Sequence, residues 1–103
     1  MVTREDAIRT ARSFVKDCQN NGLLFKKVLL FGSMARGDAH EWSDIDLLLV
    51  SDQFTDNVFK NLELYSKVNI KYPIIETHPY PTGYYLMGDS FLDEIRMNSI
   101  EIC

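Results

Sequence analysis

Two aspartates, Asp44 and Asp46, stand at the start of an apolar run that continues to Val50. In an extended strand, residues two positions apart point to the same face, with their Cα atoms about 6–7 Å apart. Two carboxylates at that spacing repel each other, and burial raises the pKa of one of them unless a cation compensates. The pair therefore suggests a site for a divalent cation. The alternative is two solvated aspartates at the frayed start of a strand, because Asp is poorly suited to strands.

A turn upstream of the aspartates offers groups that suit a phosphate. Gly32 follows an apolar run, and Ser33 can begin a short helix that extends through Arg36. Backbone N–H groups at a helix start, a hydroxyl and the missing Cβ of glycine can together hold a phosphate. A Gly-Ser pair alone is more often an ordinary turn. Arg36 can either neutralise a triphosphate oxygen or cap the carbonyls of the short helix.

Together, the turn and the aspartate pair place phosphate donors beside metal ligands. Mg²⁺ in proteins is commonly held by a few carboxylates together with substrate phosphates and water. Two such ions about 3.5–4 Å apart can activate an attacking oxygen and stabilise a leaving pyrophosphate. Positioning and charge neutralisation then carry the reaction, and the protein has little covalent chemistry to perform.

The elements that must position these groups follow from hydrophobic periodicity and turn residues. Thr3 and Asp6 resemble a capping box before a helix over residues 4–20. Asp52 or Thr55 can cap a second helix that runs to about residue 67, and Asp89 or Ser90 can cap a final helix that runs to about residue 97. The predicted strands cover 28–31, 45–50, 70–77 and, as a possible edge strand, 100–102. The run 45–50 is apolar on both faces, which suggests a central strand that is covered on each side. The connection 32–43 is too short for a crossover helix, so the first two strands should be antiparallel neighbours. The sequence thus predicts one α/β domain, residues 1–103, in which helices flank a small mixed β-sheet.

The second half of the chain carries less regular patterns. We expect the helix after residue 52 to turn one set of side chains toward the core, namely Val58, Phe59, Leu62, Tyr65 and Ser66. Pro79 and Pro81 should end the third strand, because proline cannot donate to a strand ladder. Residues 80–88 should form a loop, whose tyrosines can stack on a base, contact a partner or cover the edge of the core.

Composition narrows the function classes. The net charge is −4, so the chain lacks the excess of basic residues that is typical of a general nucleic-acid binder. We therefore do not expect nucleic acid as a partner. Cys18 and Cys103 are the only cysteines, and they suggest neither a disulfide framework nor a zinc site. No apolar run approaches the length of a membrane span, so we expect a cytoplasmic protein without a membrane partner.

The stretch GSMARGDAHEWSDIDLLLV, residues 32–50, resembles the signature of the minimal nucleotidyltransferases, a family within the polymerase-beta-like nucleotidyltransferase superfamily. That signature is Gly-Ser-x-Ala-Arg-Gly, a short loop, then Ser-Asp-Ile-Asp-Leu and an apolar run. The matching residues are Gly32, Ser33, Ala35, Arg36, Gly37, Ser43, Asp44, Ile45, Asp46 and Leu47. The strict match covers roughly a fifth of the chain.

The resemblance implies a mixed-sheet α/β core and transfer of a nucleoside monophosphate, expected to be AMP from ATP. It implies Mg²⁺, expected as two ions, held by Asp44 and Asp46. It also implies a set of residues that bind the nucleotide: Gly32, Ser33, Arg36 and Ser43.

A third carboxylate is expected from the strand that follows. Family members commonly place a further acidic residue there, and Glu76 is the only acid in "IKYPIIETHPY". Glu76 is therefore the candidate for a third metal ligand, or for the base that takes the proton of the attacking hydroxyl. His78, two residues on, is open to three interpretations: a ligand, a base or a surface residue.

Small members of this family often resemble antitoxins that are paired with an all-helical HEPN-type ribonuclease toxin. The resemblance implies that such a toxin is the partner and that one of its tyrosines receives the AMP. The alternative is a non-catalytic module that inhibits its partner by occlusion. A role on a small molecule or an RNA end ranks last, because the chain is acidic and has no room for a second substrate domain.

Overall fold

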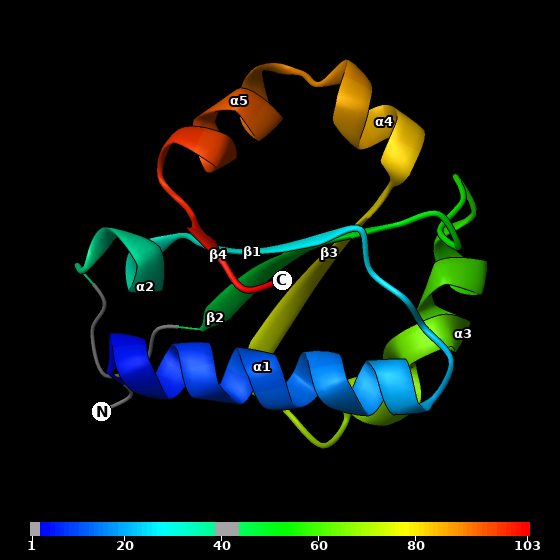
Figure 1. The fold of residues 1–103 in the computed structure, drawn as a ribbon, viewed down its shortest axis with the longest axis horizontal. Coiled ribbons are helices and arrows are strands. Elements are labelled where there is room, and N and C mark those ends of the chain that lie inside the picture. The colour runs from blue at the N-terminus through cyan, green and yellow to red at the C-terminus, as the bar shows by residue number, and fades with distance from the viewer. Residues whose placement is uncertain (1–2, 39–43) are drawn as a thin grey trace.

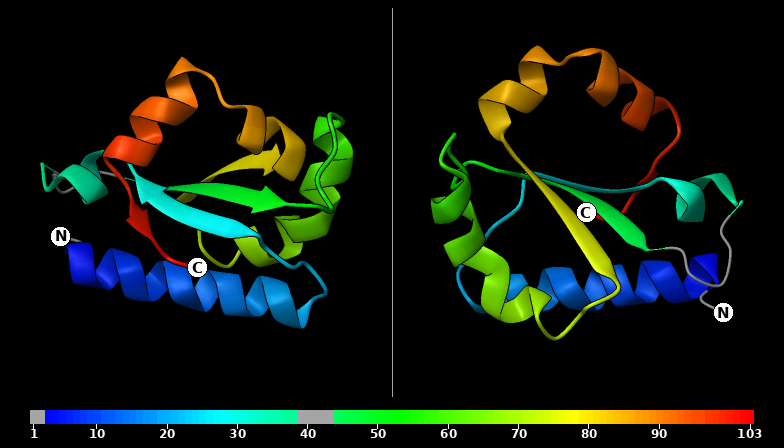
Figure 2. Two further views of the ribbon diagram at one scale, coloured as in Figure 1. Left: turned by 45° about the horizontal axis from the view of Figure 1, so that its top comes forward. Right: turned by 180° about the vertical axis from the view of Figure 1, so that it is seen from behind.

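The computed structural model describes residues 3–38 and 44–103. Its helices are α1 (Arg4–Asn20), α2 (Ser33–Arg36), α3 (Val58–Asn69), α4 (Thr82–Met87) and α5 (Ser90–Met97). Its strands are β1 (Lys27–Phe31), β2 (Ile45–Ser51), β3 (Ile75–Pro81) and β4 (Ile100–Glu101). In this described part the strands form one sheet in the order β3-β2-β1-β4. Helices α1 and α3 lie on one side of the sheet, and α4 and α5 lie on the other (Figures 1 and 2).

The sheet is mixed, as the sequence predicts. β1 pairs antiparallel with β2 and with β4, whereas β2 pairs parallel with β3. β2 is central, and six of its seven residues are buried. Leu47 and Leu49 belong to the core beneath α1 and α3, while Leu48 and Val50 belong to a second core beneath α4 and α5. The alternation along β2 therefore directs Asp46 to the same side of the sheet as α4 and α5.

The first helix is confirmed at both ends. Thr3 and Asp6 form a complete capping box, and the helix runs to Asn20. Its first residue also reaches a distant element, because the Arg4 guanidinium donates to the carbonyls of Met34, at 3.3 Å, and Ala35, at 2.9 Å. The short helix α2, which follows the turn at Gly32, is thus attached to α1.

The third helix begins later than predicted and turns a different face inward. Neither Asp52 nor Thr55 caps it; the cap is Asn57, whose side chain accepts from the Lys60 N–H at 3.1 Å. The prediction for its inner face is wrong for most positions, since Val58 is 64% and Phe59 78% exposed. The buried side chains are those of Asn61, Tyr65 and Val68. Hydrophobic periodicity favoured the neighbouring stripe because it scores a polar Asn61 as an outward residue.

Asn61 is buried because the backbone satisfies its side chain. Its amide accepts from the Thr55 N–H at 2.8 Å and donates to the Thr55 carbonyl at 2.7 Å. We predict that Asn61→Ala lowers the free energy of unfolding by about 2 kcal/mol, because it leaves both backbone groups unpaired beneath the helix. Urea denaturation measures this, with the exposed Lys60→Ala as the control. An equal midpoint for Asn61→Ala and the wild-type chain would contradict the prediction.

The third strand begins five residues later than predicted. Residues 70–74 form the turns after α3, and β3 runs from Ile75 to Pro81. Pro79, which was expected to end the strand, lies inside it opposite Leu49, whereas Pro81 is its last residue, as predicted, and lies opposite Ser51. An edge strand tolerates proline because one side of its backbone needs no ladder bonds, and β3 is at the edge.

Helices α4 and α5 close the second side of the sheet. The expected loop 80–88 is wrong, because residues 82–87 form α4. The expected final helix is confirmed, with Asp89 as its cap and Leu92 and Ile95 buried. Within residues 3–38 and 44–103, no helix is long and apolar enough to cross a membrane. The cytoplasmic location stays a prediction.

Candidate active site

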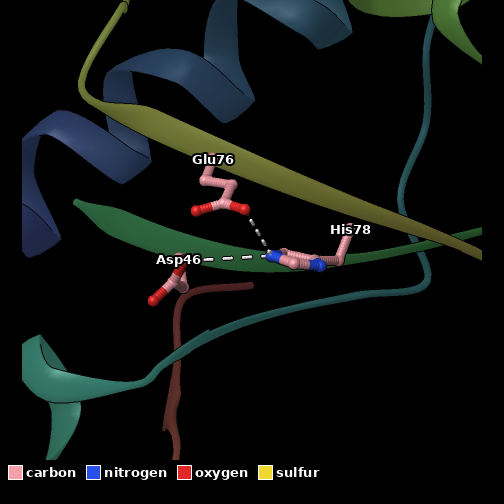
Figure 3. A group of neighbouring side chains, drawn as sticks. All are labelled: Asp46, Glu76 and His78. Carbon is pink, nitrogen blue, oxygen red and sulfur yellow. Dashed lines mark ion pairs between the residues drawn. The ribbon is translucent and has the colours of Figure 1, made fainter.

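Asp46, Glu76 and His78 gather on the α4/α5 side of the sheet (Figure 3). Asp46 on β2 and Glu76 on β3 are direct register partners of the parallel pair, so their side chains leave the sheet together. His78 lies two residues further along β3 and points to the same side. Each of the three offers one ligand atom, and these atoms all lie within 4.8 Å of one another. We call these three residues the acidic cluster.

The Gly32 turn packs directly against this cluster. Phe31, the last residue of β1, is the register partner of Asp46, so Gly32 lies beside the aspartate. A Cβ on Gly32 would stand 2.4 Å from Oδ2 of Asp46, and the φ of Gly32 is +77°. Only glycine combines this backbone angle with room for the carboxylate. The backbone at the start of α2 and the Asp46 carboxylate therefore face one space.

The electrostatics of the cluster favour a bound cation. Burial raises the pKa of the Asp46 carboxyl, the charge of Glu76 raises it further, and His78 acts in the opposite direction. The charge of Asp44 also raises this pKa, although Asp44 is exposed and lies outside the cluster. Negative charges thus converge on Asp46 from two sides, and a divalent cation would relieve their repulsion.

His78 lies beside the two carboxylates, and its side chain is 30% exposed. Its Nε2 stands 3.8 Å from Oδ1 of Asp46 and 3.9 Å from Oε1 of Glu76. That nitrogen is buried and makes no hydrogen bond to any described residue. The ring is held in place by an edge contact with Phe31, at 5.1 Å between centroids. The sequence could place this histidine only as one of three possibilities, and its orphaned nitrogen is aimed at the two carboxylates.

The donor set of the cluster fits a divalent cation. The carboxylates of Asp46 and Glu76 are the oxygen ligands that Mg²⁺ prefers, and Asp44 can supply a further oxygen from the start of β2. The imidazole of His78 adds a nitrogen, which suits transition ions such as Ni²⁺ better than Mg²⁺. Both observations agree with the sequence prediction of a metal site at these residues, which stays a prediction.

The imidazole yields a test of metal preference. We predict that His78→Gln weakens Ni²⁺ binding by about tenfold while Mg²⁺ binding changes little, because only Ni²⁺ gains from a nitrogen ligand. Calorimetric titration of each ion into the metal-free protein measures both affinities, with Glu101→Gln as a remote control. Equal losses for the two ions would contradict a ligand role for this nitrogen.

The residues predicted to bind the nucleotide are placed in part. Ser33 opens α2 next to Gly32, at the edge of the acidic cluster. Arg36 ends α2, and its Nε is 3.3 Å from Oδ2 of Asp38 in an exposed pair. Arg4 already donates to two carbonyls of α2, those of Met34 and Ala35. Ser43 lies outside the described residues.

The tyrosines of the predicted loop divide between core and surface. Tyr85 is buried beneath α4, and the guanidinium of Arg96 stands 4.2 Å from the centre of its ring. Tyr84 is half exposed and donates to Asp89 at 2.8 Å, and its ring lies beside that of Tyr80. Tyr85 therefore covers the core, as one of the predicted alternatives has it.

Comparison with known proteins identifies the domain type. Residues 11–79 match a family model described as "Nucleotidyltransferase domain". This span is more than half of the chain, and it contains the Gly32 turn, Asp44 and the whole acidic cluster.

Two proteins of Methanocaldococcus jannaschii are similar in sequence. "Putative protein adenylyltransferase MJ0604" is 48% identical over 50 residues, which are 48% of this chain and 47% of that protein. The match thus spans about half the length of that relative. "Putative protein adenylyltransferase MJ0141" is 33% identical over 79 residues, which are 74% of this chain and 77% of that protein.

Solved structures share the fold. A "putative nucleotidyltransferase from Sulfolobus solfataricus" superposes with a TM-score of 0.68 at 22% identity, over 95% of this chain and 80% of that one. A chain of a toxin–antitoxin complex with AMP-PNP gives a TM-score of 0.61 at 18% identity, over 89% of this chain and 72% of that one. A chain of a mutant of the toxin–antitoxin pair MntA-HpeT gives a TM-score of 0.59 at 17% identity, over 88% of this chain and 70% of that one.

Proposed function

Since this chain belongs to the nucleotidyltransferase domain family, we propose that it transfers AMP from ATP to a hydroxyl group of a partner protein. The observation that carries the proposal is the convergence of Asp46 and Glu76 on the Gly32 turn, where a polyphosphate and a cation would share one space. The names of the two relatives as protein adenylyltransferases support a protein acceptor. The toxin–antitoxin complexes of the same fold support a toxin as that acceptor.

Asp44, Asp46 and Glu76 would hold the metal, expected as Mg²⁺. When bound, the ion supplies charge neutralisation for the phosphates and polarises the reacting oxygens. The backbone and hydroxyl of the Gly32–Ser33 turn hold a phosphate, and Arg36 neutralises a phosphate oxygen. Together these groups would hold the triphosphate beside the acidic cluster.

Glu76 is the better placed of the two clustered carboxylates to act as the base. Its side chain is 57% exposed, against 23% for Asp46, so an incoming hydroxyl can reach it. The attacking oxygen forms a bond to the α-phosphorus, its proton passes to Glu76, and the bond to pyrophosphate breaks. We propose a tyrosine of a HEPN-type toxin as the source of that hydroxyl.

The position of the label tests the reaction. The protein is incubated with Mg²⁺, the purified product of the neighbouring gene, and ATP labelled either at the α- or at the γ-phosphate. Transfer of AMP labels the partner from α-labelled ATP alone, whereas phosphoryl transfer would label it from γ-labelled ATP. Labelling from γ-labelled ATP, or from neither, would overturn the proposal.

Inhibition by occlusion is the second candidate, and one observation favours it. Leu86 and Met87 on α4 are 73% and 87% exposed, so two adjacent apolar side chains are available to a partner. A double variant, Asp44→Asn with Asp46→Asn, separates the two functions in a growth assay with the toxin. Loss of neutralisation supports the enzyme, and full neutralisation supports occlusion.

A further inference from the structure

A groove of about 210 Å³ opens between α5 and the junction of β1 with α2. One wall is made by Phe31, Gly32 and Arg36, and the other by α5 and its end, through Phe91, Glu94, Ile95 and Asn98. We call this the α5 groove. It lies on the same side of the sheet as the acidic cluster, because α5 covers that side (Figure 1).

The groove is continuous with the site through two residues. Gly32 lines the groove and also packs against the carboxylate of Asp46. The ring of Phe31 contacts His78 on one side, at 5.1 Å, and Phe91 on the other, at 6.3 Å. A molecule whose phosphates lie at the Gly32 turn can therefore extend its other end past Phe31 into the groove.

The lining of the groove suits a flat ring that carries an amino group. Phe31, Phe91 and Ile95 offer aromatic and apolar surface, against which a nucleobase can pack. The exposed side chains of Glu94 and Asn98 supply the polar rim. The Nδ2 of Asn98 donates to the backbone carbonyl of Glu94 at 3.4 Å, which leaves its Oδ1 as an acceptor, and the Glu94 carboxylate on the same groove is a second acceptor. Two acceptors match the two N–H donors of an exocyclic amino group.

We propose that the α5 groove is the nucleobase subsite and that it takes adenine, with Glu94 and Asn98 reading the exocyclic amino group. This assignment rests on the proposed nucleotidyl transfer and adds the part of the protein that selects the nucleotide. The sequence did not reveal it, because Phe31 and Asn98 meet only after α5 folds back over the end of β1.

Binding of a substrate analogue tests the subsite without turnover. The ligand is α,β-methylene ATP, whose α–β linkage cannot be cleaved by nucleotidyl transfer, and tripolyphosphate serves as the ligand without a base. We expect Phe91→Ala to weaken binding of the analogue by roughly tenfold and to leave the affinity for tripolyphosphate unchanged, because only the analogue loses a contact between its base and the ring. Phe91 is 45% exposed, so truncation removes little of the core. Phe59→Ala, on the opposite side of the sheet, is the matched control.

A second pair of variants tests the amino group. Wild-type protein should bind the adenosine analogue more tightly than its inosine counterpart, in which a carbonyl replaces the amino group. Glu94→Ala should remove most of that preference, whereas Glu63→Ala, exposed on α3, should keep it. Equal binding of both analogues by the wild-type protein would overturn the role of Glu94.

The outcomes separate this inference from the proposed function. If the wild-type protein binds the adenosine analogue and Phe91→Ala binds it equally well, the groove assignment fails and nucleotidyl transfer stands. That result is also the one expected if the groove receives the acceptor side chain. If the wild-type protein binds neither the analogue nor tripolyphosphate, both proposals fail.

Discussion

Asp46→Asn is expected to reduce the transfer of AMP by at least about 100-fold while leaving the fold intact. The amide keeps the shape of the side chain beside Gly32. It removes the negative charge that is expected to bind the metal ion of the metal–triphosphate complex. The measurement is the initial rate of labelling from α-labelled ATP, at saturating Mg²⁺. Glu101→Gln, a remote carboxylate paired with Lys27, is the control and should keep the full rate.

The same variant has a predicted effect on stability. Burial and the charge of Glu76 raise the pKa of Asp46 in the folded protein, so its ionised form opposes folding above that pKa. Without metal at neutral pH, Asp46→Asn should therefore be at least as stable as the wild-type protein. The difference should disappear in acid, where Asp46 is protonated in both the folded and the unfolded chain. A variant that is inactive because it is unfolded would contradict both expectations.

Gly32→Ala is expected to abolish transfer and to destabilise the protein by about 1–3 kcal/mol. The φ of +77° is costly for alanine, and the new Cβ would stand 2.4 Å from Oδ2 of Asp46. The aspartate or the turn must therefore move, and either shift separates the carboxylate from the predicted phosphate site. Transfer rate and chemical denaturation together measure the effect.

Two other glycines separate the causes. Gly22 has φ +92° but nothing within 4 Å of an added Cβ, so Gly22→Ala tests the backbone angle alone. Gly83, in α4, has neither a positive φ nor a close neighbour, so Gly83→Ala should be neutral or slightly stabilising. If Gly22→Ala lowers activity as much as Gly32→Ala does, the contact with Asp46 is not the reason.

Local signals made much of the fold predictable. The capping box at Thr3, the Asp89 cap and the doubly apolar run of β2 each depend on neighbouring residues, and each is confirmed. The start of β3 and the inner face of α3 depend on long-range pairing, and there the predictions were wrong. Hydrophobic patterns could not show that Thr55 satisfies a buried Asn61, or that Pro79 lies on an edge strand.

The candidate site was predictable to the extent that it is continuous in sequence. Gly32, Asp44 and Asp46 fall within one recognisable motif, and Glu76 followed from being the only acid near its strand. No local sequence pattern predicted that the His78 side chain points toward the two carboxylates. That orientation depends on the register that sets Glu76 beside Asp46, and on the ring of Phe31 that supports the imidazole.

The parallel register of β2 and β3 has a kinetic consequence. Asp46 and Glu76 become neighbours only after α3 has carried the chain across the sheet, so the early, disordered ensemble offers no preformed pocket for a cation. A ligand that binds only the finished fold raises stability by mass action. Because the site needs both strands in their native register, added metal should slow global unfolding and leave the rate of chain collapse unchanged.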